Sequence, residues 1–113
     1  MPHQPKRGEI WQVNFSPQLG DEIRNQHPAV VVSDPNVGIL QLRSVVPITD
    51  ASGNHAWLVD LLPSQTNGLT KPCVADAFQC KSISVDRFMF KRGSVNPEDF
   101  QEIMEAVLLC LGM

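Results

Sequence analysis

The chain has 113 residues, of which 42% are hydrophobic and 19% are charged, and its net charge at pH 7 is −3. This length predicts a single domain over residues 1–113, and the apolar content is enough for a buried core, which excludes a disordered chain. The mild negative charge excludes a uniformly basic nucleic-acid binder, and the longest apolar run, residues 106–111, is far too short to span a membrane.

The first half of the chain predicts β-strands separated by turns. Residues 9–15 alternate between apolar and polar side chains, which is the pattern of a strand with one buried face. Residues 28–33 form a β-branched run typical of a central strand, and residues 34–36 are turn formers. Another strand is predicted over residues 39–46, and residues 48–49 extend it if Pro47 lies at a sheet edge or a bulge.

The second half predicts short strands and a terminal helix. Strands are expected at residues 56–61 and 73–78, a loop at residues 63–72, and a mixture of strand and turn at residues 82–90. Asn96 is suited to cap a helix that begins at Pro97. The apolar face of this helix comprises Phe100, Ile103, Met104, Val107, Leu108 and Leu111. We therefore expect a mostly β (α+β) fold in which this whole face packs on the sheet.

The polar loop at residues 16–27 is the first candidate site, because long irregular loops in compact domains are often functional. Arg24 offers a planar guanidinium that suits a phosphate, and His27 can give or take a proton near neutral pH. A metal-free attack on a phosphodiester needs groups of these two kinds. The alternative is a polar loop whose charges pair with one another, for example Glu22 with Arg24.

Two strand ends offer weaker candidates. The hydroxyl of Thr49 can bond a phosphate oxygen or orient a 2′-hydroxyl, although a threonine at this position is more often a turn former. Gln79 and Lys81 follow another predicted strand, where the alternative is a solvated junction.

Neither the histidines nor the cysteines are spaced for a metal site. His3, His27 and His55 lack the short intervals of zinc ligands, and the three cysteines contain no Cys-x-x-Cys pair. We therefore expect no metal and no cofactor. The odd cysteine count argues against a disulfide framework, and the first residues are basic without an apolar stretch, so a reducing cytoplasm is the expected location.

Charge is unevenly distributed along the chain. Residues 81–93 carry four basic residues against one acidic residue, a net charge of +3, whereas residues 94–113 carry four acidic residues and no basic one. Such a basic segment can create an attractive field over a binding site. The alternative is a solvated loop beside a solvated helix face.

Taken together, these segments resemble the MazF/PemK family, the toxins of type II toxin–antitoxin systems. The resemblance begins at residues 6–11 (KRGEIW) and continues through residues 15–17 (FSP), 20–24 (GDEIR) and 28–33 (PAVVVS). Residues 47–49 (PIT) and 79–87 are similar to the second and third blocks of the family, and the terminal helix completes the match. The resemblance implies a small SH3-like or CcdB-like β-barrel that forms a homodimer.

The resemblance also implies an activity. Members of this family are metal-independent endoribonucleases, or mRNA interferases, that cut single-stranded mRNA. Attack of a 2′-hydroxyl on the neighbouring phosphate leaves a 2′,3′-cyclic phosphate and a 5′-hydroxyl, so the protein must move protons and hold the charge of the phosphate. The RNA would lie across the dimer interface, in a groove that a cognate antitoxin blocks.

Site residues carry over from the family position by position. Thr49 matches a catalytic-site threonine, whereas His27 stands where many members have an arginine immediately before the strand-opening proline. We therefore assign catalysis to Arg24, His27 and Thr49, with Arg24 on the phosphate, His27 as the proton-transfer group and Thr49 as the orienting group. RNA binding is assigned to Glu22, Asn25, Gln79 and Lys81.

The departures from the family pattern support a second hypothesis. The absence of the family arginine at position 27 favours a non-catalytic, CcdB-like toxin or binding module that acts on a protein partner such as a topoisomerase. Lys81 stands where an arginine is usual, and Phe78 stands where an acidic residue is frequent. These two differences imply an altered RNA-contacting surface.

Overall fold

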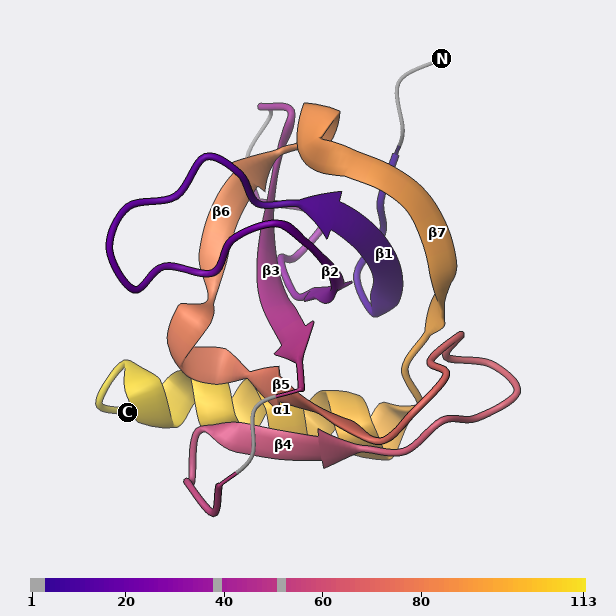
Figure 1. The fold of residues 1–113 in the computed structure, drawn as a ribbon, viewed down its shortest axis with the longest axis vertical. Coiled ribbons are helices and arrows are strands. Elements are labelled where there is room, and N and C mark those ends of the chain that lie inside the picture. Colours follow the sequence, from indigo (N-terminus) through magenta and orange to yellow (C-terminus); the bar gives the residue numbers. More distant parts are fainter. Residues whose placement is uncertain (1–3, 38–39, 51–52) are drawn as a thin grey trace.

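The computed structural model describes residues 4–37, 40–50 and 53–113 (Figure 1). Its elements are β1 (Glu9–Asn14), β2 (Gln26–Val31), β3 (Leu42–Thr49), β4 (Leu58–Leu61), β5 (Cys73–Asp76), η1 (Ala77–Gln79), β6 (Lys81–Ser84), η2 (Val85–Arg87), β7 (Phe88–Ser94) and α1 (Pro97–Cys110), where η marks a short 3₁₀ helix. The predicted mostly β fold with a C-terminal helix on the sheet is confirmed.

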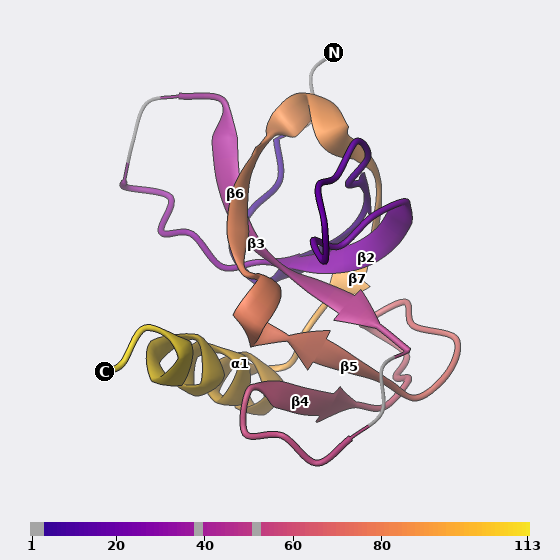
Figure 2. The ribbon, with the colours of Figure 1, turned by 60° about the vertical axis from the view of Figure 1, so that its left-hand side comes forward.

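The strands form one antiparallel sheet in the order β4-β5-β3-β2-β1-β7, with β6 as an additional partner of β3. One edge of β3 is divided, because its residues 42–45 pair with β6 and its residues 48–49 pair with β5. The sheet curls around a centre in Figure 1, and in Figure 2 α1 lies alongside β4 and β5. Within the described residues β7 pairs only with β1, so the expected barrel does not close.

Side chains of the central strands alternate between two hydrophobic cores. The helix core lies between the sheet and α1 and includes Ile10, Val30, Val46, Ile48, Leu61 and Ile103. The barrel core fills the inside of the curl and includes Trp11, Val13, Phe15, Val31, Val45 and Phe88. Neighbouring residues of one strand point to opposite faces of the sheet, so β1, β2 and β3 each contribute to both cores.

Pro47 does not end the third strand. It pairs in register with Ala29 of β2, and β3 continues through it to Thr49. The proline lies between the part of β3 that pairs with β6 and the part that pairs with β5, so its missing N–H removes no ladder bond on that side. Ile39, the expected start of this strand, lies outside the described residues.

The C-terminal helix begins as predicted, but its buried face is narrower. The Asn96 side chain accepts a hydrogen bond of 2.7 Å from the backbone N–H of Asp99. Ile103 and Val107 are buried, whereas Leu108 and Leu111 are 43% and 69% exposed, so the expectation that they lie in the core was wrong. The helix packs on β4 and η1 along a stripe that the small side chain at position 106 completes.

No helix in the described parts of the chain is long and apolar enough to cross a membrane.

Candidate active site

A cavity of about 230 Å³ lies where β2 begins and β3 ends. His27 and Thr49, two of the three predicted catalytic residues, both line it. The antiparallel register that pairs Val30 with Val46 brings the start of β2 beside the end of β3. The structure therefore brings together two residues that are 22 positions apart in the sequence.

The same cavity contains two cationic side chains that were not assigned from the sequence, Arg92 of β7 and Lys71 of the loop that precedes β5. The Arg92 guanidinium donates hydrogen bonds of 3.0 Å to Gln12 Oε1 and to the carbonyl oxygen of Gly68. Lys71 Nζ lies 2.9 Å from Asp50 Oδ2, and both side chains are exposed. The net charge of +3 over residues 81–93 was the signal for Arg92, but it did not single out that residue.

The loop at residues 63–72 holds Arg92 in place. Gly68 has a φ of +69°, and a Cβ at this position would collide with the backbone carbonyl of Arg92. The loop has an internal support in Asn67, which is only 4% exposed. The Asn67 Oδ1 accepts hydrogen bonds of 3.0 Å from the N–H groups of Ser64 and Leu69. The Gly68 carbonyl that orients Arg92 therefore belongs to a loop whose conformation is fixed by internal hydrogen bonds.

Cys73 also lines this cavity. Burial raises the pKa of its thiol, and the nearby negative charge of Asp50 raises it further, while Arg92 and Lys71 act in the opposite direction. The net shift is upward, so the thiol stays protonated at neutral pH and is not an activated nucleophile. All three cysteines of the chain are free and half-buried, as expected.

Arg24 is placed outside this cavity, on the exposed part of the loop between β1 and β2. In the described part of the chain no hydrogen bond or ion pair engages its guanidinium, so the pairing with Glu22 that the alternative interpretation of this loop would require does not form. The loop turns at Asn25, whose φ is +64° and whose carbonyl accepts a 2.8 Å hydrogen bond from the N–H of Phe15. Arg24 is thus a free cation three residues before the cavity histidine, His27.

Three of the four predicted RNA-binding residues hold this loop in position. Gln79 Oε1 accepts a 3.1 Å hydrogen bond from the N–H of Ile23, and Gln79 Nε2 donates one of 3.2 Å to the carbonyl of Asp21. Glu22 Oε2 lies 4.0 Å from Lys81 Nζ. Gln79 and Lys81 therefore fasten the loop that carries Arg24 to the region where β6 begins.

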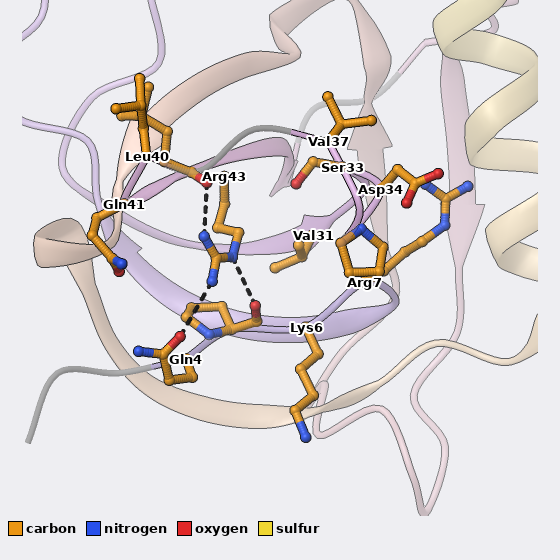
Figure 3. A pocket seen from close by; sticks show the side chains of 13 residues that line it. Gln4, Lys6, Arg7, Val31, Ser33, Asp34, Val37, Leu40, Gln41 and Arg43 are labelled. Atoms are coloured by element: carbon orange, nitrogen blue, oxygen red, sulfur yellow. Dashed lines mark hydrogen bonds between the residues drawn. The ribbon is translucent and has the colours of Figure 1, made fainter.

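A second cavity, of about 290 Å³, lies at the other end of the sheet beside the N-terminal segment (Figure 3). It contains Arg43, whose guanidinium donates hydrogen bonds to the carbonyls of Pro5 and Leu42 at 2.9 and 2.8 Å. The Arg7 side chain nearby donates to the carbonyl of Val32 at 2.7 Å. These cations anchor backbone, and none of the predicted site residues lines this cavity.

Within residues 4–37, 40–50 and 53–113 no three His, Cys, Asp or Glu side chains gather in a way that would hold a metal ion. His3 lies outside the described residues, and His55 stacks on Trp57, away from the cavity residues.

The chain is similar to known toxins over almost its full length. A family model described as PemK-like, MazF-like toxin of type II toxin–antitoxin systems matches residues 6–111. The endoribonuclease MazF9 of Mycobacterium tuberculosis is 36% identical over 96% of this chain and 97% of its own length. The crystal structure of MazF from Deinococcus radiodurans superposes with a TM-score of 0.84 at 26% identity, covering 98% of this chain and 99% of that one. A MazE–MazF crystal structure from the same organism gives a TM-score of 0.74 at 26% identity, with 96% of each chain covered.

Proposed function

The chain belongs to the PemK-like, MazF-like family of toxins from type II toxin–antitoxin systems, and on that premise we propose that it is an endoribonuclease that cuts single-stranded mRNA. The observation that carries the proposal is the cavity that gathers His27, Thr49 and Arg92 in one place. A proton-transfer group, a hydroxyl and a fixed cation are what attack by a 2′-hydroxyl on the adjacent phosphate requires.

Each group has a role in this reaction. His27 moves a proton between the attacking and leaving oxygens, and Thr49 orients the phosphate or the 2′-hydroxyl. Arg92 faces the cavity with two of its five N–H groups engaged, so the others can stabilise the charge that builds on the phosphate. Arg24 binds a phosphate of the RNA just outside the cavity, and Lys81 and Asn25 contact the RNA further along its strand. The products are a 2′,3′-cyclic phosphate and a 5′-hydroxyl. The positive charge that stabilises the phosphate during the reaction comes from these arginine side chains.

This arrangement answers the main argument for a non-catalytic, CcdB-like alternative. The family arginine is replaced by His27, but the cavity still receives a guanidinium, from Arg92 on another strand. The replacement therefore removes neither the proton-transfer group nor the cation from the site. Among the relatives, MazF9 is itself named an endoribonuclease.

We further propose that the protein acts in the cytoplasm as a homodimer neutralised by a cognate antitoxin. A MazF of similar fold crystallises together with MazE, which supports the proposal that a protein partner neutralises this chain. The apolar residues Val45 and Val46 are buried within one chain, so they do not supply the dimer surface. Leu109 on α1 and Leu111 directly after it remain exposed and are the better candidates. Light scattering at micromolar concentration is expected to give twice the chain mass, and a monomer would disprove this assembly.

The test of the activity is cleavage of a mixed RNA by purified protein in the presence of EDTA. We expect fragments with 5′-hydroxyl ends, which a kinase labels directly, and 2′,3′-cyclic phosphates at the other ends. His27→Ala and Thr49→Ala should each remove most of this cleavage. Gln101→Ala, on the exposed face of α1, is the matched control and should cut normally.

Intact RNA with the wild-type protein would favour the CcdB-like alternative. Cleavage that survives His27→Ala unchanged would keep the endoribonuclease but place its proton-transfer group elsewhere.

A further inference from the structure

Three aromatic side chains gather on the surface where β4 begins and η1 follows β5. The rings of His55 and Trp57 are stacked, with centroids 4.3 Å apart and planes 7° from parallel. The Phe78 ring lies 5.9 Å from that of Trp57 at an angle of 55°. Phe78 is 71% exposed and His55 is also exposed. We call this group the aromatic platform (His55, Trp57 and Phe78).

The backbone fixes the platform before any ligand arrives. The N–H of Ala77 donates a 3.0 Å hydrogen bond to the carbonyl of Trp57, which ties the residue before β4 to η1. The Asp76 carboxylate accepts a 3.1 Å hydrogen bond from the N–H of Phe78 and caps the 3₁₀ turn that presents the ring. The backbone of Trp57 and Phe78 is therefore held in place by hydrogen bonds, and a ligand that stacks on their rings causes little further loss of conformational entropy in the protein.

The exposure of Phe78 needs an explanation, because a large aromatic side chain gains free energy when it is buried. The packing of η1 on α1 buries Ala77 and leaves Phe78 outside, so the ring contributes little to either core. An exposed aromatic ring next to a stacked pair is a surface that another flat ring can cover.

The position of the platform indicates which kind of flat ring would cover it. Phe78 is followed at once by Gln79, which holds the loop bearing Arg24, and then by Lys81. On the other side β5 leads back from Asp76 to Cys73 in the cavity, about 10 Å for three residue steps of roughly 3.3 Å each. The platform thus continues the line from the cavity through the basic loop, which is the course we propose for the RNA.

We propose that the aromatic platform stacks an unpaired base of the RNA substrate, next to the phosphates held by Arg24 and Lys81. This inference rests on the proposed endoribonuclease function. Single-stranded RNA exposes bases that stack on aromatic side chains, and neighbouring cations bind the backbone between them.

Trp57 provides the readout for the test. The chain has two tryptophans, and Trp11 is buried in the barrel core, so quenching by a stacked base reports on Trp57. The probe is a short mixed-sequence 2′-O-methyl oligonucleotide, which lacks the attacking hydroxyl and stays intact. We expect this probe to quench the fluorescence and Phe78→Ala to raise its Kd by about 5- to 150-fold, the range that base stacking on one aromatic ring spans.

Two further variants make the result specific. Phe78→Tyr keeps the ring and should bind as the wild type does, which separates stacking from a disturbance of η1. Phe90→Ala removes a ring that is 53% exposed on β7 and should leave the Kd unchanged.

The inference is overturned if Phe78→Ala binds the oligonucleotide as tightly as the wild type while RNA cleavage by the wild type is intact. It is also overturned if Phe78→Ala changes only the affinity for a protein inhibitor, because the platform would then be a protein-binding surface. A wild-type protein that neither binds nor cuts RNA would refute the proposed function together with this inference.

Discussion

Replacing Arg92 tests whether the cavity is the site of the reaction. The guanidinium lines the cavity, and its bonds to Gln12 and to the carbonyl of Gly68 fix its orientation before RNA binds. Loss of one preorganised donor to a developing oxyanion typically lowers kcat by about 10²–10³. We therefore expect Arg92→Ala to slow cleavage of a saturating RNA by this factor.

The structure supplies a matched control in the residue immediately before Arg92. Lys91 is also a cation on β7, but its Nζ lies 3.0 Å from Glu9 Oε2, on the other face of the strand. Lys91→Ala removes the same formal charge and should leave kcat within about twofold, since its screened field reaches the cavity only weakly. Arg92→Lys keeps the charge but loses the planar fork, so it should fall between the wild type and Arg92→Ala.

Rates are to be compared on protein shown by circular dichroism to be folded, because Arg92 also donates two structural hydrogen bonds worth about 1.5–3 kcal/mol each. Single-turnover measurements separate kcat from RNA binding. Equal losses in Arg92→Ala and Lys91→Ala would refute the reasoning, because they would reduce the role of Arg92 to a general contribution to the positive field.

Three other predictions concern stability. Ile103→Ala should lower the free energy of unfolding by about 2–5 kcal/mol, whereas Leu108→Ala should change it by less than about 0.5 kcal/mol in urea titrations; similar values would show that the helix packs differently. Gly68→Ala should destabilise the protein more than Gly20→Ala. An alanine costs roughly 1–2 kcal/mol at either position because both have positive φ, but only at Gly68 would the new Cβ also strike the backbone of β7. Equal urea midpoints for the two variants would contradict this contact. Burial acts to raise the pKa of Glu9, but hydrogen bonds and a neighbouring lysine outweigh it and hold the pKa below 4.5. Its stabilising effect should therefore be complete above pH 4.5 and disappear as the pH falls through the lower folded value, and Glu9→Gln should remove that part of the pH dependence.

Local signals in the sequence were sufficient for most of the elements. The alternation over residues 9–15 and the Asn96-Pro97 cap predicted β1 and α1 almost to the residue, because these patterns act over one strand or one helical turn. Leu108 was assigned to the core from the same helical period, but the width of a buried stripe depends on what packs against it, which the helix itself does not encode.

The candidate site was predicted in part for a related reason. His27 and Thr49 flank recognisable strands, so their types and positions stood out. Arg92 enters the cavity through the pairing of β1 with β7, whose register shifts twice along its length. Those shifts decide which face each β7 side chain occupies, and no residue pattern within β7 reveals them. The role of Gln79 as a clamp depends on the fold of a loop more than 50 positions away.

The two hydrophobic cores are built from opposite faces of the same three strands, and this sharing has a consequence for cooperativity. Val45 and Val46 are neighbours on β3, yet the first belongs to the barrel core and the second to the helix core. Neither core can melt while the other keeps β1, β2 and β3 in register, so the chain should unfold in one calorimetric transition, with equal calorimetric and van't Hoff enthalpies. A substitution beneath α1 is then felt at the far side of the curled sheet, and the loop that carries Arg24 loses its support at the same temperature as the helix.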